Sequence, residues 1–224
     1  MDVSTIYNIC SIMLLAISFL AFFIGLKYKK VHKELDHLFI YSISSFLQSV
    51  FYKFLYLFKF SNKYAEFIAL NISIYTFLII ELFCLYFFFY KIRFYNKTVK
   101  KNLLYIFVFC MLSYIALSIR SNFFLKYVEY IYYIQSLIIL IPCFLYVYQL
   151  FIQPPILNLV NEASFWFISG IFIYFILTLP FFFMIHYFRN NGMWQIIGFI
   201  NMLGYCLIFL FLIRAYLCKP QITI

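Results

Sequence analysis

Apolar residues form seven long runs along the chain, and short stretches between them carry most of the charged residues. The runs lie near 6–26, 37–58, 66–90, 103–119, 128–151, 164–187 and 194–217. Crossing about 30 Å of hydrocarbon takes about 20 helical residues, so each run has about the length of a membrane span. Backbone groups in lipid must be paired, and the runs lack the alternation of a β-barrel. The pattern therefore predicts an all-α bundle of seven transmembrane helices.

The composition agrees with a chain that lies mostly in lipid. Of its 224 residues, 67% are hydrophobic and 11% are charged, whereas soluble domains are about half apolar and about a quarter charged. We expect residues 1–224 to form a single multi-pass membrane domain whose main partner is the lipid bilayer. The net charge of +10 is spread over the short connecting stretches, which argues against nucleic acid as a partner.

The positive charges predict how the bundle is oriented, because Lys and Arg in short loops are retained on the cytoplasmic side. An outer N-terminus places most of the 17 Lys and Arg residues inside, including the dense clusters Lys27–Lys33 and Lys91–Lys101. We therefore expect the N-terminus to be outside and the C-terminus to be inside.

A carboxyl group lies near the middle of the third run. Glu81 has no Lys or Arg in its own run before Lys91, and ionisable groups in lipid usually face the bundle interior or a cavity. Without a cation nearby, Glu81 is expected to be protonated and to donate a hydrogen bond. Two interpretations remain open, a switchable proton or ligand site and a neutral carboxyl that holds neighbouring helices together.

Other polar side chains lie within the runs. Tyr41, Ser45, Gln48 and Tyr52 share one face of the second helix, which predicts either helix packing through hydrogen bonds or the lining of a small cavity. The fifth run begins with a group of tyrosines at an expected membrane interface. These rings form either an aromatic belt or an outward-facing ligand pocket, for which Glu129 and Gln135 would supply polar contacts; the tyrosines are Tyr127, Tyr130, Tyr132 and Tyr133.

The last two runs have a pattern of small and aromatic residues. Trp166, Gly170 and Tyr174 recur every four residues, so a glycine lies between two aromatic side chains on one face. The seventh run has another face of small and polar groups suited to packing against the sixth run, made of Trp194, Gly198, Asn201, Gly204 and Tyr205. Small residues allow close approach of helices in membranes, so this pattern predicts that the last two helices pack together.

The same region carries a resemblance. Phe165, Trp166, Gly170 and Tyr174, followed by Trp194, Asn201 and Arg214, resemble the end of the seven-span membrane region of some bacterial sensor histidine kinases and their small stand-alone relatives. The likeness covers roughly the last 60 residues, and it lacks the kinase part. It implies a sensing or signal-relaying module in a bacterial inner membrane that acts through a separate histidine kinase or response regulator.

Enzymatic and metal-dependent functions are not expected. The chain has neither the HExxH nor the GxSxG motif, and its two Asp residues, Asp2 and Asp36, lie outside the apolar runs. The six cysteines form no CxxC pair and have no histidine at metal-binding spacing, so we interpret them as packing residues. No cofactor is predicted.

Three functions fit the sequence. The leading hypothesis is a sensor-like module that binds a small or lipidic cue and acts through a partner. The alternative is a small secondary transporter or channel with Glu81 as its proton-coupling site. The third is a structural membrane subunit that binds no ligand. The candidate ligand-binding or switch residues are Glu81, Gln48, Ser45, Tyr52, Gln135 and Asn201.

Overall fold

The structure, a computed structural model, describes residues 3–28, 31–32, 34–58, 63–92, 97–120, 128–152, 159–184 and 194–218. The elements are α1 (Val3–Tyr28), α2 (Leu38–Phe58), α3 (Lys63–Lys91), α4 (Lys97–Arg120), α5 (Val128–Ile152), the short 3-10 helix η1 (Leu159–Asn161), α6 (Ala163–Phe183) and α8 (Trp194–Tyr216). These residues contain no strand. The prediction of an all-α fold is confirmed for this part of the chain.

Six helices of the described part, α1, α2, α3, α5, α6 and α8, are long and apolar enough to cross a membrane. The fourth predicted run coincides with α4, whose side chains are described only over Lys101–Ala116, a stretch shorter than a span. Six of the predicted spans therefore correspond to helices of spanning character, and the crossing by α4 stays a prediction.

The predicted boundaries agree with the helices to within a few residues wherever the structure describes both. The run at 37–58 corresponds to Leu38–Phe58, and the run at 128–151 corresponds to Val128–Ile152. The run at 164–187 corresponds to α6, which ends at Phe183, and residues 185–187 lie outside the described part. Hydrophobic length thus locates the helices well.

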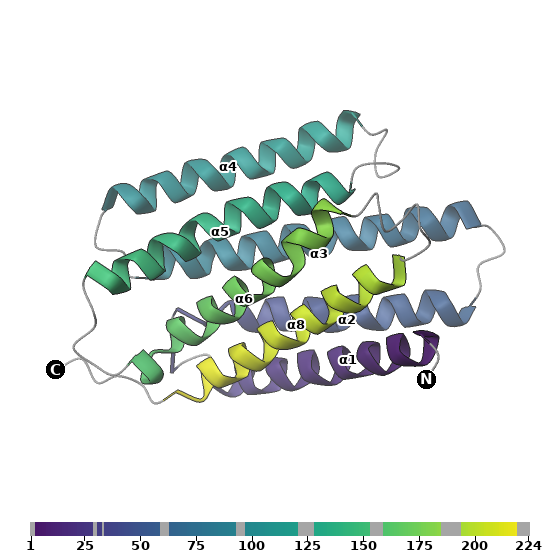
Figure 1. Cartoon of the computed structure of the whole chain (residues 1–224), viewed down its shortest axis with the longest axis horizontal. Coiled ribbons are helices and arrows are strands. Elements are labelled where there is room, and N and C mark those ends of the chain that lie inside the picture. Colours follow the sequence, from purple (N-terminus) through teal and green to yellow (C-terminus); the bar gives the residue numbers. More distant parts are fainter. Residues whose placement is uncertain are drawn as a thin grey trace.

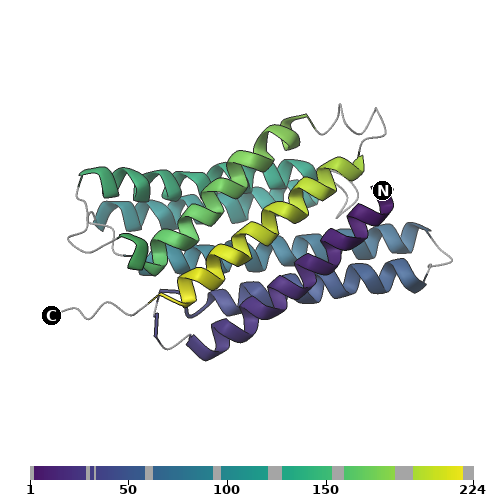
Figure 2. The same ribbon diagram turned by 60° about the horizontal axis from the view of Figure 1, so that its bottom comes forward.

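The helices form an elongated bundle in which α1 begins and α8 ends at opposite ends (Figure 1). The views in Figures 1 and 2 show α6 and α8 side by side and inclined to α4 and α5. The most extensive packing joins α6 to α8, and α8 in turn packs against α1. In contrast, α4 packs mainly against α5 and α3 at the edge of the bundle.

Large apolar side chains occupy both the core and the outer faces of the bundle. Phe88, Phe167 and Phe209 are fully buried, whereas Phe109 and Phe144 are more than half exposed. An exposed apolar surface of this extent would be unfavourable in water but is the surface that lipid tails contact. The burial pattern therefore agrees with a multi-pass protein in a bilayer.

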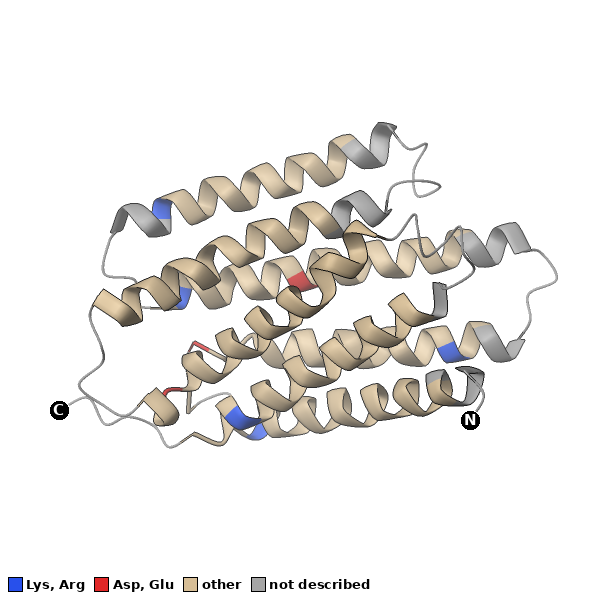
Figure 3. Cartoon of the chain, in the orientation of Figure 1, with Lys and Arg blue, Asp and Glu red and all other residues tan. Residues whose placement is uncertain are grey.

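The described charged residues are distributed unevenly along the bundle. Figure 3 shows Lys and Arg positions toward the ends of the helices and an acidic position about half-way along the bundle. Lys27, Lys91 and Arg214 lie in the last turns of α1, α3 and α8. Charged groups thus avoid the middle of the bundle, with Glu81 of α3 as the exception considered next.

Candidate functional site

Glu81 lies in the middle of α3 and is 3% exposed. Its carboxyl group accepts hydrogen bonds on both oxygens. The Tyr41 hydroxyl of α2 donates to Oε1 at 3.0 Å, and the Gln135 amide of α5 donates from Nε2 to Oε2 at 2.8 Å. The carboxyl therefore joins three helices through side chains that are far apart in the sequence.

The hydrogen bonds continue beyond these three helices. The Tyr114 hydroxyl of α4 donates to the Gln135 Oε1 atom. On the other side, the Tyr205 hydroxyl of α8 is within hydrogen-bonding reach of Glu81, and the Tyr174 hydroxyl of α6 donates to Asn201 Oδ1 at 2.7 Å. We call this set the central polar network; its members are Tyr41, Glu81, Tyr114, Gln135, Tyr174, Asn201 and Tyr205.

The surroundings of the central polar network are apolar. The Tyr41 ring lies 6.0 Å from the Phe77 ring and 5.2 Å from the Phe209 ring, measured between centroids. Within the part of the chain that the structure describes, no Lys, Arg or His is a partner of the Glu81 carboxyl. Because a buried charge is costly unless it is hydrogen-bonded or paired, the neutral donors around Glu81 are what stabilises its ionised form.

The structure brings together some of the sequence-predicted residues and separates others. Glu81, Gln135 and Asn201 belong to the central polar network. Ser45 is buried but accepts a hydrogen bond through its backbone carbonyl, from Ser49. Gln48 donates to the Tyr52 hydroxyl at 3.4 Å on the same helix, and both side chains are only partly buried. Of the polar residues on this face of α2, Tyr41 therefore belongs to the central polar network. Gln48 and Tyr52 instead pair with each other.

Gln135 has a different position from the one that its sequence context suggests. It was considered as a lining residue of an outward pocket, together with tyrosines of the same helix. Its amide instead faces Glu81 and Tyr114 inside the bundle. The Tyr133 hydroxyl of that group donates to the Phe182 carbonyl of α6, and the side chains of Tyr127, Glu129, Tyr130 and Tyr132 lie outside the described part.

Tyr114 is not among the sequence candidates for the site, and Tyr205 is expected from the sequence only on the packing face of the seventh run. Tyrosine is frequent in this chain, with 22 copies, so a single tyrosine carries almost no signal by itself. Only the packing of α4 and α8 against the middle of α3 and α5 singles them out. Sequence spacing can place residues on one face of one helix, but it cannot show which faces meet.

The pairing of α6 with α8 depends on two glycines. A Cβ atom at Gly170 would lie 2.6 Å from the Phe211 Cβ atom, and one at Gly204 would lie 2.4 Å from the Tyr174 Cδ2 atom. The two helix backbones therefore approach where these glycines leave room for aromatic side chains. Gly198 of α8 is half-buried.

Trp166, the first residue of the predicted packing motif, packs against the C-terminal half of α8, with its ring 5.9 Å from the Phe211 ring between centroids. Its indole Nε1 donates to the Val160 carbonyl at 2.7 Å. The Arg214 guanidinium lies over the Trp166 ring, 5.2 Å from its centroid, in the geometry of a cation–π contact. This aromatic side chain thus links η1 to the last turn of α8.

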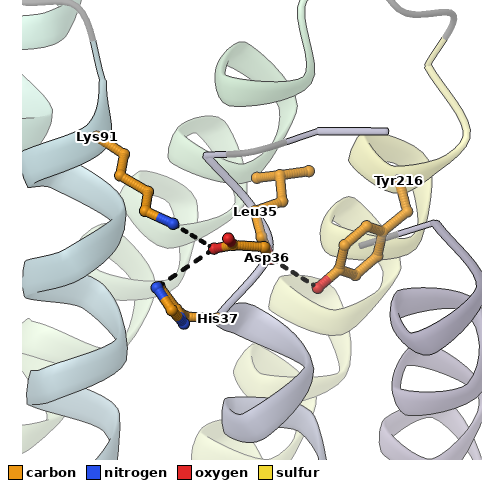
Figure 4. A network of polar contacts seen from close by, with 5 residues as sticks. All are labelled: Leu35, Asp36, His37, Lys91 and Tyr216. Carbon is orange, nitrogen blue, oxygen red and sulfur yellow. Dashed lines mark hydrogen bonds and ion pairs between the residues drawn. The ribbon is translucent and has the colours of Figure 1, made fainter. Parts of the chain in front are cut away.

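The C-terminal end of α8 is also attached to the stretch between α1 and α2. The Tyr216 hydroxyl donates to the Leu35 carbonyl at 3.1 Å, and Asp36 forms an ion pair with Lys91 of α3 at 2.6 Å (Figure 4). His37 lies 3.4 Å from the same Asp36 oxygen. We call these five residues, Leu35, Asp36, His37, Lys91 and Tyr216, the end cluster; it connects the ends of α3 and α8 with the beginning of α2.

Glu162, which precedes α6, gives the same end of the bundle a pH dependence. Its carboxyl accepts a hydrogen bond from the Tyr146 hydroxyl at 2.8 Å. Burial raises the pKa of Glu162 above its ordinary value of 4.5, the bond from Tyr146 opposes this rise, and the charge of Glu34 adds to it. The folded chain therefore favours the neutral carboxyl more than the unfolded chain does.

This shift predicts the sign of a stability change. The contribution of Glu162 is fully present below about pH 4.5, where the unfolded chain is also protonated, and is lost as the pH rises through the higher folded pKa. Glu162→Gln should therefore weaken the fall of the melting temperature with rising pH in this window. A slope equal to that of the parent chain, measured by thermal unfolding in detergent across the window, would contradict the assignment.

A groove with apolar walls lies between α3, α4 and α5, beside the network. Its lining includes Leu82 and Leu85, which neighbour Glu81 along α3, together with Leu103 of α4 and Pro142 of α5. The groove is small, with a cavity volume of about 30 Å³, and its lining side chains are mostly apolar. This volume is close to that of one water molecule, so the groove as it stands has no room for a larger ligand.

All six cysteines are free and buried, which agrees with their interpretation as packing residues. Comparisons with protein-family models, with curated proteins and with solved structures found no match for this chain. The functional interpretation therefore depends on the geometry of the central polar network and of the two ends of the bundle.

Proposed function

We propose that this chain is a sensor-like, signal-relaying membrane module in which a change at the central polar network alters helix packing and is read by a separate protein. The observation that supports the proposal best is the position of Glu81. A carboxyl group half-way along a membrane-spanning helix is costly, and such groups usually serve function. Here it holds α2, α3 and α5 together through both of its oxygens.

The connection from the network to the end cluster gives the relay a physical route. Tyr205 and Tyr216 both belong to α8, so a displacement of this helix at Tyr205 also displaces Tyr216. Tyr216 is bonded to the Leu35 carbonyl, next to the ion pair of Asp36 with Lys91. A small shift of α8 would therefore reposition the stretch between α1 and α2, as helix shifts do in other switching proteins.

The proposed orientation places the end cluster on the cytoplasmic side of a bacterial inner membrane. Lys27, Lys91 and Arg214 lie in the last turns of helices that end at this side of the bundle, and basic residues favour the cytoplasmic side. A cytoplasmic histidine kinase or response regulator would then contact the end cluster. The cue would be small or lipidic: a small cue such as a proton would act at Glu81 itself, and a lipidic cue would act on the exposed apolar faces of the bundle.

Capture of partners from native membranes tests the relay. The tagged protein is crosslinked in its native membrane, purified under mild detergent and compared with the Tyr216→Phe variant. This variant removes the bond to the Leu35 carbonyl and keeps the ring. We expect a kinase or response regulator with the parent chain and a several-fold lower yield with the variant. Recovery of no signalling protein by the parent chain would remove the main support for the proposal.

The same carboxyl supports a second candidate, a small proton-coupled transporter or channel. Proton relays in transporters use intramembrane carboxylates of this kind, and the hydrogen-bond partners of Glu81 in the described part of the chain are neutral side chains. In proteoliposomes, this function predicts substrate movement driven by a pH gradient and abolished by Glu81→Gln. Partner capture without any proton-driven flux favours the relay, and flux without partner capture favours the transporter.

A further inference from the structure

The Tyr205 hydroxyl lies between two possible acceptors. It is within hydrogen-bonding reach of the Glu81 carboxyl on one side and of the Tyr174 hydroxyl on the other. The rings of Tyr205 and Tyr174 lie 4.9 Å apart between centroids, and both side chains are buried. A tyrosine has one hydroxyl proton, so Tyr205 can donate fully to only one of these two groups at a time.

We propose that Glu81 is a reversible proton-binding site and that Tyr205 transmits its state to Tyr174 on α6. The inference rests on the proposed relay and names its cue as the proton. In the ionised state, the carboxylate accepts bonds from Tyr41, Gln135 and Tyr205. Binding of one proton from water to a carboxyl oxygen changes the charge of the site from −1 to zero and makes Glu81 a donor.

The protonated state also has a complete set of hydrogen bonds. Glu81 then donates to the Tyr205 oxygen, and Tyr205 turns its own proton toward the Tyr174 oxygen. Tyr174 accepts this bond with a lone pair and continues to donate to Asn201 Oδ1, the last acceptor of the chain. Because both states are satisfied, the site can change state without leaving a buried polar group unpaired.

The other two partners of Glu81 are less suited to reverse their roles. Among the described residues the acceptor for the Tyr41 hydroxyl is Glu81 itself, and the rings of Phe77 and Phe209 pack beside it. Gln135 would have to turn its amide, which would present its NH₂ group to the Tyr114 hydroxyl that now donates to Oε1. Tyr205 is the partner whose proton has a second acceptor within reach.

The charged and titratable groups around Glu81 are consistent with a proton as the ligand. The titratable groups facing it in the described part are Tyr41 of α2, Cys84 of α3, Tyr174 of α6 and Tyr205 of α8, and α5 contributes the neutral amide of Gln135. None of these side chains is a cation at neutral pH. A proton is therefore the positive charge that the site can take up without rearranging the helices.

Protonation of Glu81 would act where α6 and α8 approach each other closely. Tyr174 packs against Gly204, the residue before Tyr205, with no room for a Cβ atom between them. A new bond from Tyr205 to Tyr174 would strengthen the attachment of α6 to α8 at this point. The proton would thus alter the helix pair whose end carries Tyr216.

Infrared difference spectra of the full chain in lipid nanodiscs test the proton site. Spectra are compared between about pH 5 and about pH 9, which brackets the range in which buried carboxyl groups titrate. We expect C=O bands of protonated carboxyl groups to develop at low pH, with the component from residue 81 lost in Glu81→Gln and the component from Glu162 retained. Glu81→Asp, which keeps a carboxyl group, should retain a band at a shifted frequency. A spectrum without a protonated-carboxyl band that depends on residue 81 would overturn the proton site.

The role of Tyr205 is tested in the same spectra through the tyrosine C–O band. In the parent chain, this band should shift together with the carboxyl band. The Tyr174 hydroxyl donates to Asn201 in both states, and in the protonated state it also accepts a hydrogen bond from Tyr205. Tyr205→Phe should keep the carboxyl band and lose the part of the tyrosine shift that Tyr205 and Tyr174 contribute, while the part from Tyr41, which donates to the carboxyl, remains. Tyr174→Phe should lose only the part that Tyr174 contributes. The control Tyr148→Phe, at a tyrosine that is 63% exposed on α5, should retain both bands. A tyrosine shift in Tyr205→Phe that is as large as in the parent chain would overturn the relay through this residue.

The spectra need no partner protein, so they test the proton site at Glu81 independently of the relay to a separate protein. Partner capture without a carboxyl band dependent on Glu81 leaves the relay in place and removes the proton as its cue. A Glu81 band without partner capture keeps the proton site and contradicts the relay to a separate protein.

Discussion

Replacement of Gly204 by alanine is expected to lower the free energy of unfolding by about 3 kcal/mol, the upper end of the cost of overpacking a well-packed core. The new Cβ atom would lie 2.4 Å from Cδ2 and 2.8 Å from Cε2 of the Tyr174 ring. This ring is 1% exposed and its hydroxyl is bonded to Asn201, so it cannot move aside cheaply. Helices α6 and α8 would have to separate.

Thermal unfolding in detergent, followed with a thiol-reactive dye, measures the loss. The dye is suited to this chain because all six cysteines are free and buried and become reactive on unfolding. Leu210→Phe is the matched control, since it adds more volume to α8 at a position that is 49% exposed. Equal melting temperatures for Gly204→Ala and the parent chain would show that α6 and α8 are not packed as closely as described.

Replacement of Glu81 by leucine is expected to cost about 2 kcal/mol of stability, because it leaves the donors of Tyr41 and Gln135 without their acceptor in a dry interior. Glu81→Gln should cost less, since its carbonyl oxygen still accepts one of these bonds. The two variants therefore separate the loss of hydrogen bonds from the loss of the ionisable group. Their order of stability is the informative quantity.

The same dye assay measures this order, and partner capture or proton-driven flux measures function in parallel. We expect Glu81→Gln to be close to the parent chain in stability and to lose the functional readout. Glu81→Gln could instead be as unstable as Glu81→Leu, while the protein of each variant that stays folded keeps its partner capture or flux. The central polar network would then serve stability alone. The chain would then be the ligand-free structural subunit that the sequence also allows.

Thr76→Val offers a surface comparison for these variants. Thr76 lies on α3, as Glu81 does, but it is exposed and its hydroxyl donates to the Ile72 carbonyl of the preceding turn. Loss of this local bond should change stability by less than about 0.5 kcal/mol, the usual range for surface substitutions. A similar cost at Thr76 and Glu81 would mean that burial of the network contributes little.

Glu81 shows how far the sequence can lead toward the site. Its position in an apolar run was enough to mark it as unusual, because a carboxyl group in lipid is costly wherever the helices are placed. Its partners were not predictable in the same way. From the sequence, Tyr41 lies on a polar face and Gln135 is a candidate for an outward pocket. Tyr205 lies on the packing face of the seventh run, and Tyr114 is one of many tyrosines in this chain.

The helix pair α6 and α8 was easier to anticipate. Gly170 lies four residues after Trp166 and four before Tyr174, on the same helical face. Helix backbones in a membrane can approach closely at such small residues. The structure places Gly170 against Phe211 and Gly204 against Tyr174. Trp166 contacts Phe211 and Arg214 of α8 as the packing motif predicts, whereas its bond to the Val160 carbonyl was not indicated by its spacing.

The amino-acid sequence by itself determined that the chain is helical and where its helices run, since hydrophobic length and the need to pair backbone groups in lipid are properties of each segment alone. It also determined that a single carboxyl group would lie in the middle of this apolar material. Only the tertiary structure decided which side chains surround Glu81 and how Tyr216 reaches Leu35. Contacts between helices depend on which faces meet, and that is settled by the packing of all the helices together.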